Sequence, residues 1–306
     1  CDKDGNELTI IETLVGAGGA HLGFKNAGFK SLLVNDNDKD TIETLLLNNV
    51  IDKEQCLLCP IEDITEDMIL SKIENKKVDV LFGGIVCKGF SLAGVRNPFD
   101  PRNYLYQHQL RLVNILKPKV SVIENVTAIK NMMLYINCAE TIKTFEDYTE
   151  LSDANKLLNG EKSSKRKNGE DYSELNVKIN MNKKNMAELL KNIDKYKYSV
   201  LDDIKKMYTE MGYRFYEKIL QTDKYGGYTN RKRIIMVAVR NDITKEYVYP
   251  TEQDTNNTLN DALNLIDYEG INNPSTDVDN KSMNHNQKTV DRFKLIPEGK
   301  NIADVV

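Results

Sequence analysis

The stretch ETLVGAGGAHLGF, residues 12–24, places glycines at positions 16, 18 and 19 between an apolar run and a segment with helical spacing. Glycine lets the backbone come close to a ligand, and the N-terminus of the following helix offers free N–H groups to a carboxylate or phosphate. Many such loops are only tight turns, and the spacing is not the GxGxxG of dinucleotide-binding proteins. The loop alone is therefore a weak signal of a ligand site.

Strand-like and helix-like segments alternate around this loop. Apolar runs predict strands at residues 8–14, 31–36, 55–63, 78–84 and 119–126. Helical spacing predicts helices at residues 21–29, 40–49 and 66–74, and at 104–117, which stops before Pro118. A further helix at 201–212 precedes two strands at 213–222 and 231–242. This alternation predicts an α/β fold, a doubly wound and mostly parallel sheet with helices on both faces.

The composition of the 306 residues, 40% hydrophobic and 29% charged, is typical of a soluble globular protein. The net charge of −4 gives no overall basic field that would indicate a nucleic-acid partner. A local basic patch is still compatible with this charge. No run is long enough to span a membrane, and no signal peptide opens the chain. The chain starts at Cys1 rather than Met, which leaves open that its natural N-terminus lies upstream.

The five cysteines are odd in number and irregularly spaced, which favours free thiols in a reducing, intracellular setting. Cys56 and Cys59 have CxxC spacing, but no second pair accompanies them. Thiols buried around a strand are therefore favoured over a zinc site.

Two acidic residues follow predicted strands on the same side of the sheet as the glycine loop. Asp36 ends the second strand, about 20 residues past the loop, where an acid can hold ribose hydroxyls. Asp63 follows the third strand and could accept a hydrogen bond from an adenine amino group. Each could equally cap the helix that comes next. The three features together favour a cofactor that contains adenosine.

A cysteine and a glutamate follow the next two strands. Cys87 lies in LFGGIVCKGFSLAG, residues 81–94, and Glu124 begins ENV at the end of the fifth strand. A thiol and a carboxyl group at neighbouring strand ends could serve one substrate. Arg231 and Arg233 start the last strand, and alternation puts both on one face. Taken singly, Cys87 could be a packed thiol, Glu124 a helix cap and the arginines surface charges.

Taken together, these motifs resemble the DNA (cytosine-5)-methyltransferase family, over about residues 8–240 and more faintly to 301. The family's motifs match, in order, ETLVGAGG (12–19), GGIVCKGFSLAG (83–94), DPRNYL (100–105), ENV (124–126) and TNRKRIIMVAVR (229–240). Five motifs in the family's order and spacing are strong evidence for the resemblance, whereas any one of them would be modest evidence.

The resemblance implies the Rossmann-like fold of S-adenosylmethionine-dependent methyltransferases, with S-adenosylmethionine as cofactor, no metal, and DNA as substrate. Cys87 would add to C6 of a cytosine flipped out of the duplex. Glu124 would hold N3 and the exocyclic amine, and Arg233 the O2 edge, with Arg231 supporting the loop. C5 would take the methyl group and lose its proton, and Cys87 would leave. Thiolate is the side chain best suited to attack C6, and cationic neighbours such as Lys88 would favour it.

The resemblance also implies which residues contact the ligands. Those for the cofactor are Leu14, Gly16, Ala17, Gly18, Gly19, Asp36, Asn37, Asp63, Ile64, Gly84, Val86 and Leu105. Those for the nucleic acid are Lys88, Ser91 and Arg102. Such phosphate contacts position the strand without reading its sequence.

The sequence departs from the family at several positions. Val86 replaces the usual Pro, Lys88 the usual Gln and Leu14 an aromatic residue, while Thr229 stands in place of Gln. Without proline the backbone regains its freedom in φ and an N–H, so the loop is less preorganised. None of the groups that do chemistry is missing.

We expect a catalytic domain over residues 1–250, with an inserted polar segment at about 139–200 that is partly helical, partly mobile and docks a partner. Residues 251–306, with a helix at 258–266, are expected to be a linker toward a target-recognition domain absent from the chain. The chain would then be part of a truncated or split enzyme that needs a second polypeptide or a missing C-terminal region for target recognition. It would reside in the cytoplasm at the nucleoid, or in a eukaryotic nucleus.

Two alternatives remain open at this point. One is a regulatory or DNA-binding subunit that keeps the fold and has impaired catalysis, which the departures at Leu14, Val86 and Lys88 favour somewhat. The other is a tRNA cytosine-5 methyltransferase, because the same cysteine and glutamate chemistry works on RNA.

Overall fold

The computed structural model describes residues 5, 7–85, 100–253, 257–264 and 287–296. Four predicted site residues, Val86, Cys87, Lys88 and Ser91, lie outside the described residues. The chain forms two compact units, Cys1–Gln221 with Lys232–Thr251, and Thr222–Arg231 with Glu252–Val306. The domain boundary expected at residues 250–251 stays a prediction.

The first unit is built on a seven-stranded sheet. Its strands are β1 (Thr9–Thr13), β2 (Lys30–Asp36), β3 (Cys56–Leu58), β4 (Val80–Gly84), β5 (Val120–Asn125), β8 (Tyr213–Gln221) and β9 (Lys232–Arg240). They lie in the order β3-β2-β1-β4-β5-β9-β8, parallel from β3 to β5, whereas β9 runs antiparallel to both of its neighbours. The predicted doubly wound, mostly parallel sheet is confirmed.

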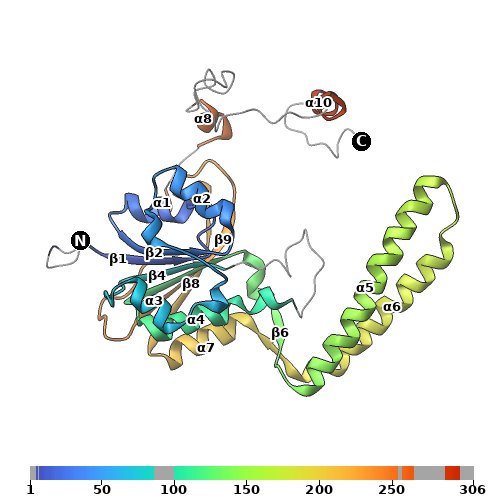
Figure 1. Ribbon diagram of the computed structural model, residues 1–306, viewed down its shortest axis with the longest axis horizontal. Helices are drawn as coiled ribbons and strands as arrows, with labels where there is room; N and C mark the ends of the chain where they lie inside the picture. Colours follow the sequence, from blue (N-terminus) through green and yellow to red (C-terminus); the bar gives the residue numbers. More distant parts are fainter. Residues whose placement is uncertain (1–4, 6, 86–99, 254–256, 265–286, 297–306) are drawn as a thin grey trace. The chain divides into compact units, whose positions relative to one another are not determined.

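Helices cover both faces of this sheet (Figure 1). They are α1 (Gly19–Asn26), α2 (Lys39–Leu47), α3 (Glu66–Lys72), α4 (Leu105–Leu116) and α7 (Val200–Glu210). In Figure 1, α1 and α2 lie on one face, and α3, α4 and α7 on the other. The main hydrophobic core lies under α3, α4 and α7, where Leu81, Leu110 and Ile123 are fully buried. Burial of these side chains holds the strands in register.

The polar segment between β5 and α7 forms a helical hairpin. Strands β6 (Met133–Tyr135) and β7 (Lys197–Ser199) pair antiparallel at its base. From them rise α5 (Ala139–Asn168) and α6 (Ser173–Asn192), which lie side by side (Figure 1). Tyr135, Tyr148 and Ile193 bury a small core at the base, and Leu175 and Ile179 are buried farther along α6. This sparse apolar stripe is enough to pair two otherwise polar helices.

The described residues of the second unit include two short α-helices, α8 (Leu259–Leu263) and α10 (Gln287–Lys294). The Thr258 side chain caps α8 by accepting from the N–H of Asp261, so this helix starts where it was expected. Among the described residues, none of the helices combines the length and the apolar character needed to cross a bilayer.

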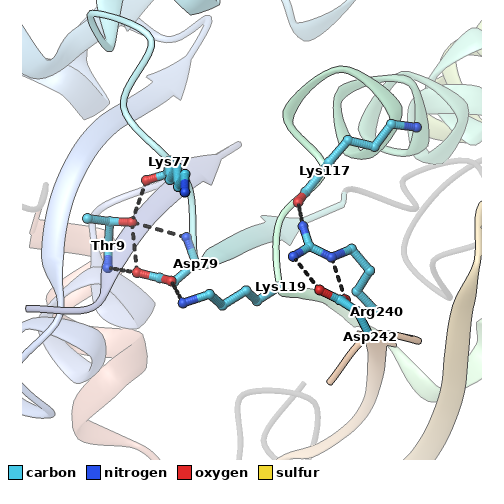
Figure 2. Close-up of polar contacts among 7 residues, drawn as sticks. All are labelled: Thr9, Lys77, Asp79, Lys117, Lys119, Arg240 and Asp242. Atoms are coloured by element: carbon cyan, nitrogen blue, oxygen red, sulfur yellow. Dashed lines mark hydrogen bonds and ion pairs between the residues drawn. The ribbon is translucent and has the colours of Figure 1, made fainter. Parts of the chain in front are cut away.

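At the amino edge of the sheet, Asp79 joins three strands (Figure 2). Its carboxylate accepts from the N–H of Thr9 at 2.8 Å and from Nζ of Lys119 at 2.7 Å, and its own N–H donates to the Thr9 hydroxyl at 3.0 Å. Burial works to raise the pKa of Asp79, but the hydrogen bonds from Lys119 and Thr9 outweigh it and hold that pKa below its ordinary value. Arg240 and Asp242 pair nearby, where the Asp242 side chain is 59% exposed against 14% for Asp79.

We predict that Asp79→Asn lowers the free energy of unfolding at neutral pH by about 1–2 kcal/mol, because it leaves Lys119 without its buried partner. Since the folded-state pKa of Asp79 is depressed, its stabilising effect is complete above the unfolded-state pKa of about 3.9 and is lost as pH falls through the folded value. Urea denaturation should therefore show wild type and variant converging in acid. Asp242→Asn is the matched control, and an equal loss there would contradict the role assigned to burial.

Candidate active site at the carboxyl edge of the sheet

The carboxyl ends of β1, β4 and β5 meet at one edge of the sheet. Thr13 pairs with Gly83 across β1 and β4, and Gly84 pairs with Glu124 across β4 and β5. The chain passes from β1 to β2 and β3 on one side and then crosses to β4 on the other. In such sheets ligands bind at this reversal of strand order, outside the carboxyl ends.

Glu124 and Arg233 form an ion pair at this edge. Because β9 runs antiparallel to β5, its first residues lie beside the last residues of β5, and Glu124 pairs in register with Ile235. Arg233 Nε lies 2.8 Å from Glu124 Oε1, and their side chains are 22% and 30% exposed. The pair is thus partly shielded from water yet reachable by a ligand. The alternative that Glu124 caps the next helix is wrong, since its carboxylate faces Arg233 instead.

The end of β4 is fixed by its two neighbours. Asn125 Nδ2 donates to the carbonyl oxygen of Ile85 at 3.1 Å, where the chain leaves β4. A Cβ on Gly84 would lie 3.3 Å from the carbonyl oxygen of Leu14, so the end of β4 packs closely against the glycine loop. On the other face, a Cβ on Gly83 would lie 2.7 Å from the buried side chain of Gln109. Both glycines are therefore required by close approach.

The glycine loop has an unusual backbone. Leu14, Gly16 and Gly18 all have positive φ, at 52°, 56° and 85°. A positive φ at a leucine is strained, and such strain gathers at functional sites. Gly18 begins α1 and no side chain caps this helix, so its first N–H groups remain for a ligand. Ala17 and Gly19 are exposed beside them.

Asp36 braces this loop from beneath. It is 8% exposed, and its carboxylate accepts from the N–H of Gly16 at 2.9 Å and from the N–H of Asp38 at 3.0 Å. Asp38 is the residue that caps α2, by accepting from Thr41 N–H. The helix-cap interpretation of Asp36 is therefore wrong. A carboxylate has about four lone-pair sites, so Asp36 keeps capacity for a further donor.

The remaining predicted cofactor contacts differ in their exposure to solvent. Asp63 is exposed at the end of a short 3₁₀ helix, and it does not cap α3, because Thr65 does so through Met68 N–H. Asn37 is exposed next to Asp36. Ile64 is 1% exposed within the main core, and Leu105, at the start of α4, packs against that core.

Of the predicted nucleic-acid residues, Arg102 is the one that the structure describes, and it lies in the first unit. Arg102 is about half exposed and forms an ion pair with Asp100, and its hydrogen bond lowers the pKa of Asp100. Arg231 belongs to the second unit, where its N–H donates to the Thr222 hydroxyl at 3.2 Å. The structure thus brings Glu124 and Arg233 together, and it describes Arg231 only within its own unit.

Two buried polar contacts under the loop escaped the sequence analysis. Glu12 (0% exposed) contacts Nδ1 of His21 (2% exposed) in the first turn of α1. The Thr13 hydroxyl donates to Oε1 of Gln109 at 2.5 Å. The sequence offered one signal for the Glu12–His21 contact, an acidic residue inside an apolar run. Nothing in the sequence pointed to the second.

A cavity of about 820 Å³ lies between the start of α4, α7 and the base of the hairpin. Tyr104, Tyr135, Phe145 and Tyr198 line it, and burial raises the pKa of Tyr104 to about 12. None of the predicted site residues that the structure describes is among the residues that line it. Among the described residues, no group of three or more His, Cys, Asp or Glu side chains could hold a metal ion.

The family model described as C-5 cytosine-specific DNA methylase matches residues 8–151 and 183–303. The chain belongs to this family. The residues that match the family model include the glycine loop, Glu124 and Arg233. Residues 152–182, the distal part of the helical hairpin, lie outside the match.

Several curated relatives of this chain are type II methyltransferases. M.Sau96I of Staphylococcus aureus is 25% identical over 249 residues, which are 81% of this chain and 42% of the relative. M.Eco47II of Escherichia coli is 27% identical over 266 residues, or 84% and 46%. M1.HphI of Haemophilus parahaemolyticus is 39% identical over 122 residues, or 39% and 32%. The chain spans less than half the length of each of these relatives.

A solved structure shares the fold of this chain. A crystal structure of a DNA modification methyltransferase encoded within a prophage (E. coli) matches 84% of this chain and 54% of its own, with a TM-score of 0.53 and 18% identity. The sheet and its flanking helices therefore form the Rossmann-like fold of S-adenosylmethionine-dependent methyltransferases.

The geometry of the loop predicts that Gly18 cannot be replaced. An alanine Cβ there would lie 2.3 Å from Cδ2 of Leu45, at a φ of +85°. We expect Gly18→Ala to lower the free energy of unfolding by about 2 kcal/mol or more. The matched control is Gly23→Ala in the middle of α1, where a Cβ meets nothing within 4 Å. It should stabilise the protein by up to about 1 kcal/mol, because alanine favours the helix. Urea denaturation of both variants checks this, and similar effects in the two would contradict it.

Proposed function

We propose that this chain carries the catalytic machinery for transfer of a methyl group to C5 of cytosine in DNA. The observation that carries the proposal is the Glu124–Arg233 ion pair at the carboxyl edge of the sheet, directly beside the end of β4. A carboxyl group and a guanidinium held together form a polar edge of both donors and acceptors. That is what the N3, amine and O2 edge of cytosine requires.

Cys87 is the proposed nucleophile of this site. It follows Gly84 by three residues, and Gly84 pairs in register with Glu124. Each residue extends a chain by at most about 3.6 Å, so the backbone of Cys87 stays within about 11 Å of Gly84. This limit is compatible with a thiol that reaches a base bound between Glu124 and Arg233.

The residues around the glycine loop fit S-adenosylmethionine. A Cβ on Gly16 or Gly19 would meet nothing within 4 Å, so there is open space along the loop. The Asp36 carboxylate would accept from the ribose hydroxyls, the uncapped start of α1 would bind the methionine carboxylate, and Asp63 would accept from the adenine amine. When bound, S-adenosylmethionine supplies an electrophilic methyl group.

The protein's own groups then act in a fixed order on a cytosine flipped out of the duplex. The Cys87 thiolate forms a bond to C6, while Glu124 shares a proton with N3 and so draws electrons from the ring. C5 becomes nucleophilic and gains the methyl group. The C5 proton leaves to a base, the C5–C6 double bond returns, and the sulfur–C6 bond breaks. Flipping costs a few kcal/mol, which contacts in the pocket recover.

We also propose that target recognition resides on polypeptide beyond these 306 residues, either continuous with this chain or on a second one. Phosphate contacts from Arg102 and the loop that carries Cys87 would position a strand but would not read its sequence. The recognition sequence is therefore expected to depend on that additional polypeptide.

We predict that the chain forms a covalent adduct with DNA in which 5-fluorocytosine replaces cytosine. Fluorine at C5 cannot leave as a proton does, so the step that frees Cys87 is blocked. The chain, alone and with lysate of its source cells, is incubated with the cofactor and long fluorinated DNA of mixed sequence. Denaturing gels and peptide mass spectrometry detect the adduct.

Cys87→Ser should abolish the adduct, whereas the matched control Cys138→Ser should leave it intact. Glu124→Gln should slow its formation by about 10²–10⁴-fold, the usual contribution of a positioned acid or base. An adduct that survives Cys87→Ser would overturn the proposal. Absence of any adduct from wild-type protein under both conditions would favour a non-catalytic subunit, and an adduct on fluorinated tRNA alone would favour an RNA substrate.

A further inference from the structure

The helical hairpin has an uneven distribution of charge. Its distal half, residues 156–184, carries eight Lys and Arg against four Asp and Glu, for a net charge of +4. Its proximal parts, residues 139–155 and 185–192, carry two basic and six acidic residues, for a net charge of −4. The whole chain has a net charge of −4, so the distal half is a basic region on an acidic protein.

Several of these cations are available for a partner. Arg166, Lys167, Lys183 and Lys184 are exposed, and none takes part in the ion pairs of the described residues. Elsewhere in the distal half Lys156 does pair, with Asp153 at 2.7 Å. Unpaired surface cations keep their full attraction for an external polyanion.

The hairpin is a fixed support for these charges. Asn182 Nδ2 donates to Oδ1 of the largely buried Asn155 at 3.1 Å, which sets the register of the two helices. Gly169, with φ of 75°, ends α5 in a left-handed cap and turns the chain toward α6. An α-helix rises about 1.5 Å per residue, so the 30 residues of α5 span about 45 Å.

The hairpin also begins near the candidate active site. β5 ends at Asn125, one residue past Glu124, and α5 begins at Ala139. Only a 3₁₀ turn and β6 lie between them, and the small core around Tyr135 and Ile193 anchors the hairpin base. The basic half is therefore attached through a short, ordered connection to the edge at which DNA would bind.

We propose that the distal half of the α5–α6 hairpin binds the phosphate backbone of duplex DNA outside the segment that enters the catalytic site. This proposal rests on the proposed function, because it takes DNA as the polymer bound at the carboxyl edge. The surface contributes affinity and no sequence reading, since lysine and arginine on phosphates release counterions without contacting base edges. An acidic protein is the competing partner, and the salt dependence of DNA binding separates the two.

The test compares two double variants of the full chain with the same change in net charge. Arg166→Gln with Lys167→Gln removes two cations from the distal half, and Lys143→Gln with Lys191→Gln removes two exposed cations from the proximal parts of the same helices. Glutamine keeps helix propensity, and circular dichroism checks that the helices persist. Affinity for a duplex of roughly 40 base pairs, long enough to reach past the catalytic site, is measured by fluorescence anisotropy from low to moderate KCl.

Each cation removed from a phosphate should reduce the slope of log K against log salt by about 0.9. We expect the distal variant to show a slope smaller by about 1–2 units and to bind about tenfold more weakly at roughly 0.1 M salt. The proximal variant should match wild type. Adding Lys183→Gln and Lys184→Gln should deepen the effect. Equal slopes for distal and proximal variants would overturn the proposal and favour a protein partner.

A second readout separates this proposal from the function on which it rests. If wild-type protein methylates DNA, the distal variant should raise KM for DNA and leave kcat unchanged. If wild-type protein methylates DNA but the distal variant has the same slope of log K against log salt as wild type, the hairpin proposal is contradicted and the proposed function is not. A smaller slope for the distal variant, without any methylation or adduct from wild-type protein, would support the hairpin proposal and contradict the proposed function.

Discussion

Parallel pairing of β4 with β5, joined to antiparallel pairing of β5 with β9, determines where a site can form in this protein. The first pairing sets Gly84 beside Glu124, and the second brings the start of β9 to the end of β5. Only the reversed direction of β9 lets Arg233 reach Glu124, at 2.8 Å. The ion pair is thus a consequence of strand direction and register, supported by the core around Leu81 and Ile123.

The same edge receives its second component from β1. The loop after β1 turns through three positive φ angles and is held by Asp36 from β2, so the end of one strand braces the end of its neighbour. Gly84 packs against the carbonyl oxygen of Leu14, which brings the loop and the end of β4 into contact. The proposed cofactor and base sites are therefore adjacent because β1 and β4 are adjacent.

Much of this could be predicted from the sequence, because apolar runs bounded by glycine and acidic residues mark strand ends in parallel sheets. Asp36 and Glu124 were found in this way, but their contacts were not. The sequence left a helix cap and a ligand contact equally open for Asp36, and the structure places the α2 cap two residues later, at Asp38, a shift that sequence patterns cannot resolve. The helical content of the segment at about 139–200 was underestimated from the sequence, because few apolar residues, such as Tyr148 and Ile179, pair its two helices. The role of Cys87 stays a prediction.

The distal part of the hairpin, residues 152–182, lies outside the match to the family model, and the basic end of the hairpin is opposite in sign to the net charge of the whole chain. The catalytic account itself depends on one shared cavity for sulfur, carboxylate and guanidinium. A crystal structure of the protein bound covalently to fluorinated DNA tests this most directly. It should show one extruded cytosine with C6 bonded to the sulfur of Cys87 and N3 within hydrogen-bond distance of Glu124. A base bound at any other strand end, or a sulfur turned away from Glu124, would contradict the account.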